Sequence, residues 1–215
     1  MEETSFSLIS MAAKGGWLMI VLAILSLAAI YVFAERLYAI RKALKVEKSF
    51  MKDIKDYIFA GKVRSAKALC KRSESALSRV ISRGVDKIEK PAAEIESAME
   101  NVATLEVAKL EKGLPALATI AGGAPMIGFL GTVTGMIRAF FNMAQAGNNI
   151  DITLLSSGIY EAMITTVGGL IVGILAYFGY NYLTSCVNRV VARMETASVL
   201  FLDIVQAAKD KSDGE

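Results

Sequence analysis

The residue types that carry most enzyme chemistry are scarce in this 215-residue sequence. Histidine is absent, and the two cysteines, Cys70 and Cys186, lie far apart in the sequence. Zinc fingers, CxxC redox pairs and Ser–His–Asp or Cys–His centres are therefore excluded within this chain. We expect no catalytic residue, no metal site and no cofactor, and we predict that the protein is not an enzyme.

Threonine hydroxyls are the main polar groups of the apolar part of the sequence. They belong to Thr119, Thr132, Thr134, Thr165 and Thr166. None is an acid that carries a proton, but each hydroxyl can donate and accept hydrogen bonds, and so can hold water or face a partner's carboxyl group. The commoner use is a hydrogen bond to the carbonyl four residues earlier in the same helix. The sequence leaves both uses open.

Three uncharged runs are long enough to cross a bilayer: 15–34, 113–137 and 162–188. A helix needs about 20 apolar residues to cross about 30 Å of hydrocarbon, and it satisfies its own backbone hydrogen bonds. The hydrophobic share of 54% and the mean hydropathy of +0.46 also exceed what soluble domains show. We predict an all-α membrane protein with three transmembrane helices in a lipid bilayer.

Basic residues are concentrated between the first two runs. Eighteen of the 24 lysines and arginines lie between Arg36 and Lys112, and four more follow Asn188. The positive-inside rule therefore places 36–112 and the C-terminus in the cytoplasm and the N-terminus outside. Acidic residues alternate with the basic ones, so we expect solvated helix surfaces and no nucleic acid partner.

The spacing of apolar residues divides the chain into five predicted segments. They are the N-terminus with the first span (1–40), a small helical cytoplasmic domain (41–93), one long helix that contains the second span (94–143), an outer hairpin (144–157), and a long helix that contains the third span and the tail (158–215). In both long helices the apolar stripe continues beyond the span, far into the cytoplasm. Such stripes predict burial in a helical bundle, within and between subunits.

Glycines in the second and third spans predict close helix packing. We assign packing or kinking to Pro125, Gly128, Gly131, Gly135, Gly169 and Gly173, where Pro125 removes a backbone donor and four of the glycines form two GxxxG motifs. Arg138 and Glu161 bracket the outer hairpin. These two residues could extend to the interface, pair with each other, or line the mouth of a pore.

Two stretches together resemble the paired signatures of the ExbB/TolQ/MotA proton-channel family. They are LPALATIAGGAPMIGFLGTVTGMIRAF (114–140) and EAMITTVGGLIVGILAYFGYNYL (161–183). The resemblance covers about 70 residues, and the three-span layout resembles ExbB and TolQ more than the four-span MotA. We favour the ExbB-like reading.

The resemblance implies a pentamer in the bacterial inner membrane, with spans two and three around a central pore. It implies an ExbD-like single-span partner that supplies a protonatable aspartate, and a TonB-like protein that energises outer-membrane transport. Thr132 and Thr166 match the threonines that face this aspartate, and Glu161 matches the acid at the outer, periplasmic end of span three. Thr165 stands where we expect alanine, so either Thr165 or Thr166 faces the pore. The alternatives are a TolQ-like subunit of the Tol-Pal system and a non-conducting membrane scaffold.

Overall fold

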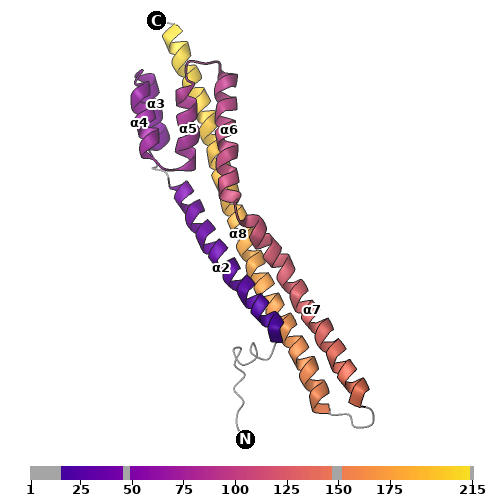
Figure 1. Ribbon diagram of the computed structural model, residues 1–215. Coiled ribbons are helices and arrows are strands. Elements are labelled where there is room, and N and C mark those ends of the chain that lie inside the picture. Colours follow the sequence, from indigo (N-terminus) through magenta and orange to yellow (C-terminus); the bar gives the residue numbers. More distant parts are fainter. Residues whose placement is uncertain (1–15, 46–48, 147–151, 214–215) are drawn as a thin grey trace. The chain divides into compact units, whose positions relative to one another are not determined.

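The computed structural model describes residues 16–45, 49–146 and 152–213 (Figure 1), with side chains for 16–45, 49–145 and 156–211. Its helices are α2 (Gly16–Leu44), α3 (Phe50–Phe59), α4 (Val63–Arg72), α5 (Ala76–Asp86), α6 (Ala92–Glu111), α7 (Leu114–Ala146) and α8 (Ile152–Asp213). No strand occurs in these described ranges. The predicted all-α fold is confirmed.

Among the described residues, three helical stretches are long and apolar enough to cross a membrane, and each of them contains most or all of one of the three uncharged runs. Their large side chains are mostly exposed in the single chain, including Ile24 (61%), Phe129 (65%) and Leu175 (67%). So much exposed apolar surface is unfavourable in water, and either lipid or other helices must cover it. The chain is a multi-pass membrane protein.

The chain folds into two compact units, whose boundaries follow the charge pattern of the sequence. Of the described residues, those within 16–34 and 113–182 form one unit, which we call the membrane unit. Those within 35–112 and 183–213 form the other, which we call the polar unit. Glu35 and Lys112 are the charged residues next to the first and second uncharged runs, so the change from apolar to charged sequence coincides with the change of unit.

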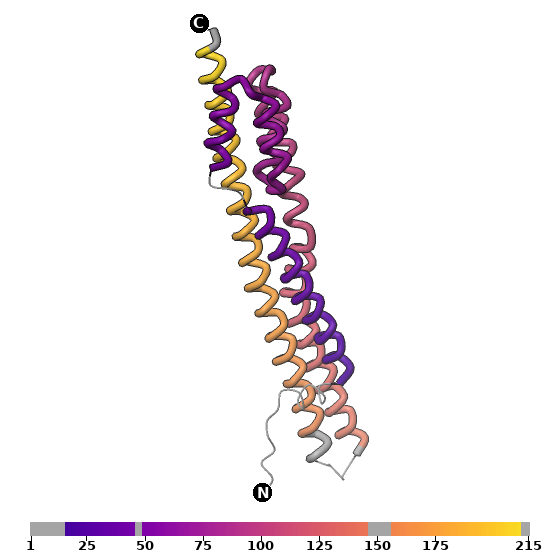
Figure 2. Tube along the Cα trace, turned by 90° about the vertical axis from the view of Figure 1, so that its left-hand side faces the viewer, coloured from indigo at the N-terminus to yellow at the C-terminus, as the bar shows by residue number. Residues whose placement is uncertain are grey.

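The membrane unit places α7 and the first half of α8 side by side, with α2 next to them (Figures 1 and 2). The two long helices are antiparallel: Pro125 lies against Gly173, Gly128 against Gly169, and Gly135 against Ala162. The buried side chains of this unit include small ones, such as those of Ala124 and Ala162, and large ones, of which Leu22 and Leu117 are each 1% exposed.

The polar unit packs α3 to α6 and the end of α8 around a conventional apolar core. Its most buried side chains include Ile54, Ile81, Ile95 and Phe201, each 0% exposed. Helix α5 begins at Ser75, whose hydroxyl accepts a hydrogen bond from the backbone N–H of Ser78 at 3.0 Å, the usual way to satisfy a free donor at a helix start. The predicted small helical domain thus includes the C-terminal part of α8 in its core.

The second long helix differs from its prediction, because the structure has two helices, α6 and α7, where the apolar pattern indicated one over 94–143. Helix α6 ends at Glu111 and α7 begins at Leu114. Between them Gly113 has a φ of 88°, in the left-handed region that glycine adopts without strain. Pro115 then lies in the first turn of α7, where its missing N–H costs little. Helix α8, in contrast, runs unbroken.

Glu106 is a nearly buried carboxylate of the polar unit, with a side chain only 4% exposed. It accepts hydrogen bonds from Arg79 on α5 and from the Nζ of Lys109, the latter at 2.7 Å. Burial alone would raise the pKa of Glu106, but the hydrogen bonds from Arg79 and Lys109 outweigh it and hold the pKa below its ordinary value. The carboxylate therefore links α5 to α6.

Glu106→Gln should lower the free energy of unfolding by about 1–2 kcal/mol at neutral pH, because the amide leaves Arg79 and Lys109 without their charged acceptor. The contribution of Glu106 is fully present above the unfolded-state pKa of about 4.3 and is lost as the pH falls through the lower folded-state pKa. The difference between wild type and variant should therefore shrink on acidification. Denaturant unfolding followed by circular dichroism measures it. Glu100→Gln, an exposed change on the same helix, is the control, and an equal effect of both would contradict this role.

Candidate functional site

A line of small residues brings α7 and α8 into close contact. A Cβ atom at Gly169 would lie 2.5 Å from the carbonyl oxygen of Ala124 and 2.9 Å from the Cα of Gly128. Since such contacts involve the backbone itself, neither helix can yield to a side chain here. All the glycines assigned to packing lie along this contact, and the ring of Pro125 fills the space beside Gly173.

Three threonines meet across this contact: Thr132 of α7 and Thr165 and Thr166 of α8, here called the threonine cluster. The hydroxyls of Thr132 and Thr166 are hydrogen-bonded to each other, and Thr166 also donates to the carbonyl of Gly128 at 3.0 Å. Thr165 donates to the carbonyl of Ala162 at 2.8 Å. The absence of a side chain at Gly128 is what lets these hydroxyls reach across the two helices.

The other threonines of the second span are used differently. Thr119 and Thr134 each donate at 2.8 Å to the carbonyl four residues earlier in α7. These are the common bonds within one helix, and both lie on exposed parts of α7. In α7, therefore, Thr119 and Thr134 bond within their own helix, whereas Thr132 bonds to the facing helix.

The two adjacent threonines of α8 have different surroundings. Thr165 is 2% exposed and lies against Gly131, which is also close to Leu18 of α2. Thr166 and its partner Thr132 are only half-buried. Thr165 therefore belongs to the interior among the three helices, while the Thr132–Thr166 pair remains accessible at the edge of the contact.

Glu161 and Arg138 lie apart from the threonine cluster. The carboxylate of Glu161 lies over the start of α2, where a Cβ at Gly16 would be 2.4 Å from its Oε1. Arg138 is exposed. In the part of the chain that the structure describes, these two residues form no ion pair with each other.

The cluster offers hydrogen bonds but no acid. Its groups are neutral hydroxyls and carbonyls. The second and third spans, 113–137 and 162–188, contain no aspartate or glutamate. A carboxylate brought to the half-buried edge could accept hydrogen bonds from the reoriented hydroxyls of Thr132 and Thr166. Proton transfer at this site would therefore require a titratable group from another molecule.

The cysteines do not add a reactive site. Burial, with a smaller effect from the nearby carboxylate of Asp86, raises the pKa of Cys70 to about 12, which disfavours the nucleophilic thiolate. The Sγ of Cys186, also buried, accepts a hydrogen bond from Arg189 at 2.9 Å. Across the described residues, no group of three or more potential metal ligands is assembled.

The cluster also includes two backbone carbonyls, those of Gly128 and Ala162, which the side-chain types in the sequence do not reveal. They accept hydrogen bonds from the threonines of the facing helix. The sequence spacing does indicate these two carbonyls. Each belongs to the residue four positions before a cluster threonine, Thr132 or Thr166, and therefore lies on the same helix face as that threonine.

Comparisons with known proteins agree with these features. Residues 72–196, more than half of the chain, match the MotA/TolQ/ExbB proton channel family. A Synechocystis protein named as an ExbB-like biopolymer transport protein is 34% identical over 80% of this chain and 68% of its own length. ExbB of Xanthomonas campestris is 33% identical over 47% of this chain, and TolQ of Haemophilus influenzae is 38% identical over 43%; each match covers 40% of that relative.

The match includes both glycine-rich spans and all three cluster threonines. The relatives carry the names of both ExbB and TolQ proteins, and one of them is similar over most of the chain. With its three apolar helices, this chain belongs to the MotA/TolQ/ExbB proton channel family.

Proposed function

We propose that this protein is the channel-forming stator subunit of a motor that the proton-motive force drives in the bacterial inner membrane. In this proposal five copies surround the spans of an ExbD-like partner, and the assembly energises outer-membrane transport through a TonB-like protein. The N-terminus lies in the periplasm and the C-terminus in the cytoplasm. Family membership supports the coarser role, a membrane proton-channel energiser subunit.

The threonine cluster is the observation that carries the proposal. Two half-buried hydroxyls, those of Thr132 and Thr166, lie in an apolar setting that contains no acid of its own. Such a pair suits hydrogen bonding to a carboxyl group that arrives on another helix. We assign the pore-facing role to Thr166 rather than Thr165, because Thr165 is buried among the helices of its own chain.

The proposed mechanism alternates the protonation state of the partner's aspartate. When ionised, the carboxylate accepts hydrogen bonds from Thr132 and Thr166; when protonated, it is neutral and can leave them for the next subunit. A proton that crosses the membrane potential releases about 2.3 kcal/mol per 100 mV. This energy biases rotation of the partner within the ring, while Glu161 and Arg138 line the periplasmic mouth.

A TolQ-like role in the Tol-Pal system is the second candidate, favoured by the similarity to the Haemophilus influenzae protein. It shares the same ring and the same threonine chemistry and differs in the protein that receives the motion. Purification from the native host distinguishes the two roles, since a TonB-like protein accompanies the complex in one case and Tol proteins in the other.

Native mass spectrometry of the complex purified from its host tests the assembly. We expect five copies of this chain with two copies of a small single-span protein that has an aspartate in its span. A lone monomer would contradict the proposal. Strong potential-driven proton current through the chain alone, reconstituted in vesicles without any partner, would contradict the proposed origin of the acid.

A further inference from the structure

A groove of about 540 Å³ lies within the polar unit, between α6 and the C-terminal part of α8. Its floor is apolar, because it includes the side chains of Met99 and Met194, each 1% exposed. Val107 and Val191 line the groove half-buried, and Val199 lines it at 59% exposure. An apolar surface of this kind between polar edges is typical of a site that another protein segment covers.

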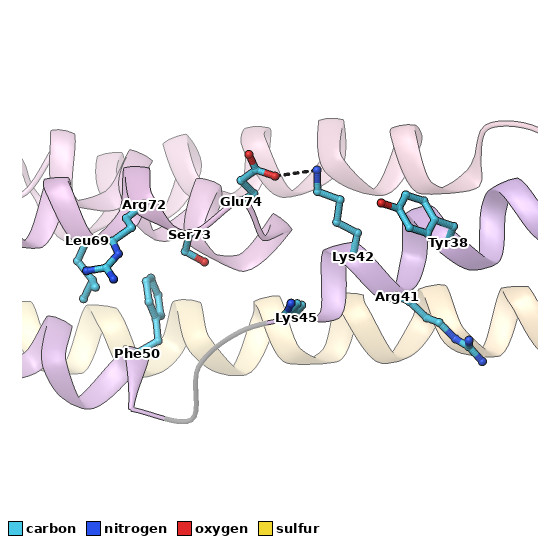
Figure 3. A pocket seen from close by; sticks show the side chains of 9 residues that line it. All are labelled: Tyr38, Arg41, Lys42, Lys45, Phe50, Leu69, Arg72, Ser73 and Glu74. Atoms are coloured by element: carbon cyan, nitrogen blue, oxygen red, sulfur yellow. Dashed lines mark ion pairs between the residues drawn. The ribbon is translucent and has the colours of Figure 1, made fainter.

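The sides of this groove are acidic. Four carboxylates line it, and no lysine or arginine does; they belong to Glu96, Glu100, Glu111 and Glu195. None of the four forms an ion pair in the part of the chain that the structure describes. Elsewhere in the polar unit, carboxylates have a cation of the same chain beside them, as Glu74 has Lys42 at 2.7 Å (Figure 3). The groove therefore suits an occupant that is apolar at its centre and cationic at its edges.

Leu105 lies at the centre of such a surface, on another side of α6. It is 62% exposed, and it precedes Val107 of the groove by two residues, which places it about 160° away around the helix. Lys109 follows Leu105 by four residues and shares its helix face. Arg83 of α5 lines the same shallow depression as Leu105. Leu105, Lys109 and Arg83 are here called the leucine face.

The leucine face carries an excess of positive charge. Arg83 is exposed and forms no ion pair among the described residues. Lys109 donates a hydrogen bond to Glu106 at 2.7 Å, but its side chain stays 68% exposed. Lys87 and Glu94, which line the same depression, pair with each other at 2.8 Å. The charges of the leucine face therefore complement those of the groove.

Leu105 and the groove are also at the same height in the polar unit. Helices α6 and α8 run in opposite directions (Figure 1), and the side chains of Met99 and Phe201 both lie against Gly84. Leu105 follows Met99 by six residues, and Glu195 precedes Phe201 by six, so Leu105 and Glu195 are level. Rotation about an axis along these helices keeps every residue at its height. A ring of copies built by such rotation brings Leu105 of one copy to the groove of the next, beside Glu195.

We propose that the groove of one copy of this chain binds the leucine face of a second copy. Leu105 inserts over the apolar floor, and Arg83 and Lys109 face the carboxylates of Glu100 and Glu195. The contact joins two different surfaces, as the interface of a closed ring requires, whereas two acidic grooves facing each other would repel. This inference rests on the five-copy ring of the proposed function and adds the surfaces through which neighbouring copies meet.

Cysteine cross-linking of the full-length chain in membranes of its host tests the contact. Leu105→Cys is combined with Glu195→Cys, and the membranes are oxidised. We expect a ladder of cross-linked products from the dimer upwards, because each copy then has one cysteine on each of the two surfaces. The native Cys70 and Cys186 are buried. Leu105→Cys with Thr196→Cys is the matched control, since Thr196 is exposed on the same helix but does not line the groove, and it should give no ladder.

Native mass spectrometry of the same complexes separates this contact from the ring itself. Five copies without a ladder from the Leu105 and Glu195 pair would overturn the contact and leave the proposed ring intact. A lone monomer without a ladder would overturn both. Equal ladders from the pair and from its control would overturn the contact as well, because the cross-link would then not depend on the groove.

Leu105→Glu provides a second test that does not use cysteines. The new carboxylate would face Glu195 of the next copy, so the fraction of five-copy complex in detergent should fall about tenfold or more. Adding Glu195→Lys should restore that fraction, which recovery from a folding defect would not explain. An unchanged five-copy fraction in Leu105→Glu would overturn the proposal.

Discussion

Replacing both Thr132 and Thr166 with valine should reduce proton-driven transport at least about tenfold while the complex still assembles. Valine has nearly the same shape as threonine, so the packing of α7 against α8 remains, but both hydroxyl donors are lost. A hydrogen bond to a charged group contributes about 1.5–3 kcal/mol, and each 1.4 kcal/mol corresponds to a factor of ten. Proton flux in vesicles and TonB-dependent uptake by the host measure the effect, and native mass spectrometry measures assembly.

Thr134→Val is the matched control for this prediction. It removes a hydroxyl from the same helix, but one whose hydrogen bonds go to backbone carbonyls of α7 itself. It should leave flux and uptake nearly unchanged. Unchanged uptake in the Thr132 and Thr166 double variant would instead favour a structural scaffold that conducts no protons.

Single variants separate the two adjacent threonines of α8. Thr166→Val should lower the flux, because its hydroxyl is at the accessible edge of the cluster. Thr165→Val should retain most of the proton flux, because the Thr165 hydroxyl is buried and donates its hydrogen bond to the carbonyl of Ala162. If Thr165→Val lowered the proton flux and Thr166→Val did not, Thr165 would be the threonine that faces the pore.

Gly169→Ala should have the largest effect on stability, a loss of about 2–3 kcal/mol. The added methyl group would overlap the carbonyl of Ala124 and the backbone of Gly128, which cannot move aside without separating the helices. Separation would also pull Thr132 away from Thr166, so proton flux should fall together with stability. Thermal unfolding of the purified complex in detergent measures the first effect and vesicle flux the second.

Gly123→Ala is the control, because a Cβ at Gly123 meets nothing within 4 Å in the chain. Alanine favours a helix over glycine by up to about 1 kcal/mol, so this variant should be as stable as wild type or slightly more stable. If Gly169→Ala proved as stable as Gly123→Ala, the close contact of α7 and α8 would be wrong.

The membrane-spanning helices were predictable from the sequence because their cause is local. An uncharged run of 20 or more residues must form a helix in lipid, whatever its neighbours are. The sequence pattern did not predict the break between α6 and α7 at Gly113, because the apolar stripe continues through this residue and the spacing of apolar residues carries no information on the φ angle of a single residue. The feature of the sequence that indicates this break is Gly113 followed by Pro115 two positions later.

The threonines show where local reasoning ends. The sequence by itself determined that the two long spans offer hydroxyls and glycines but no acid, because composition does not depend on folding. Only the tertiary structure decided that Thr132 and Thr166 meet, that Thr165 is buried, and that Thr119 and Thr134 bond within their own helix. These roles depend on the register of α7 against α8. That register is decided by contacts such as Gly128 on Gly169, between residues that are distant in sequence and adjacent in space.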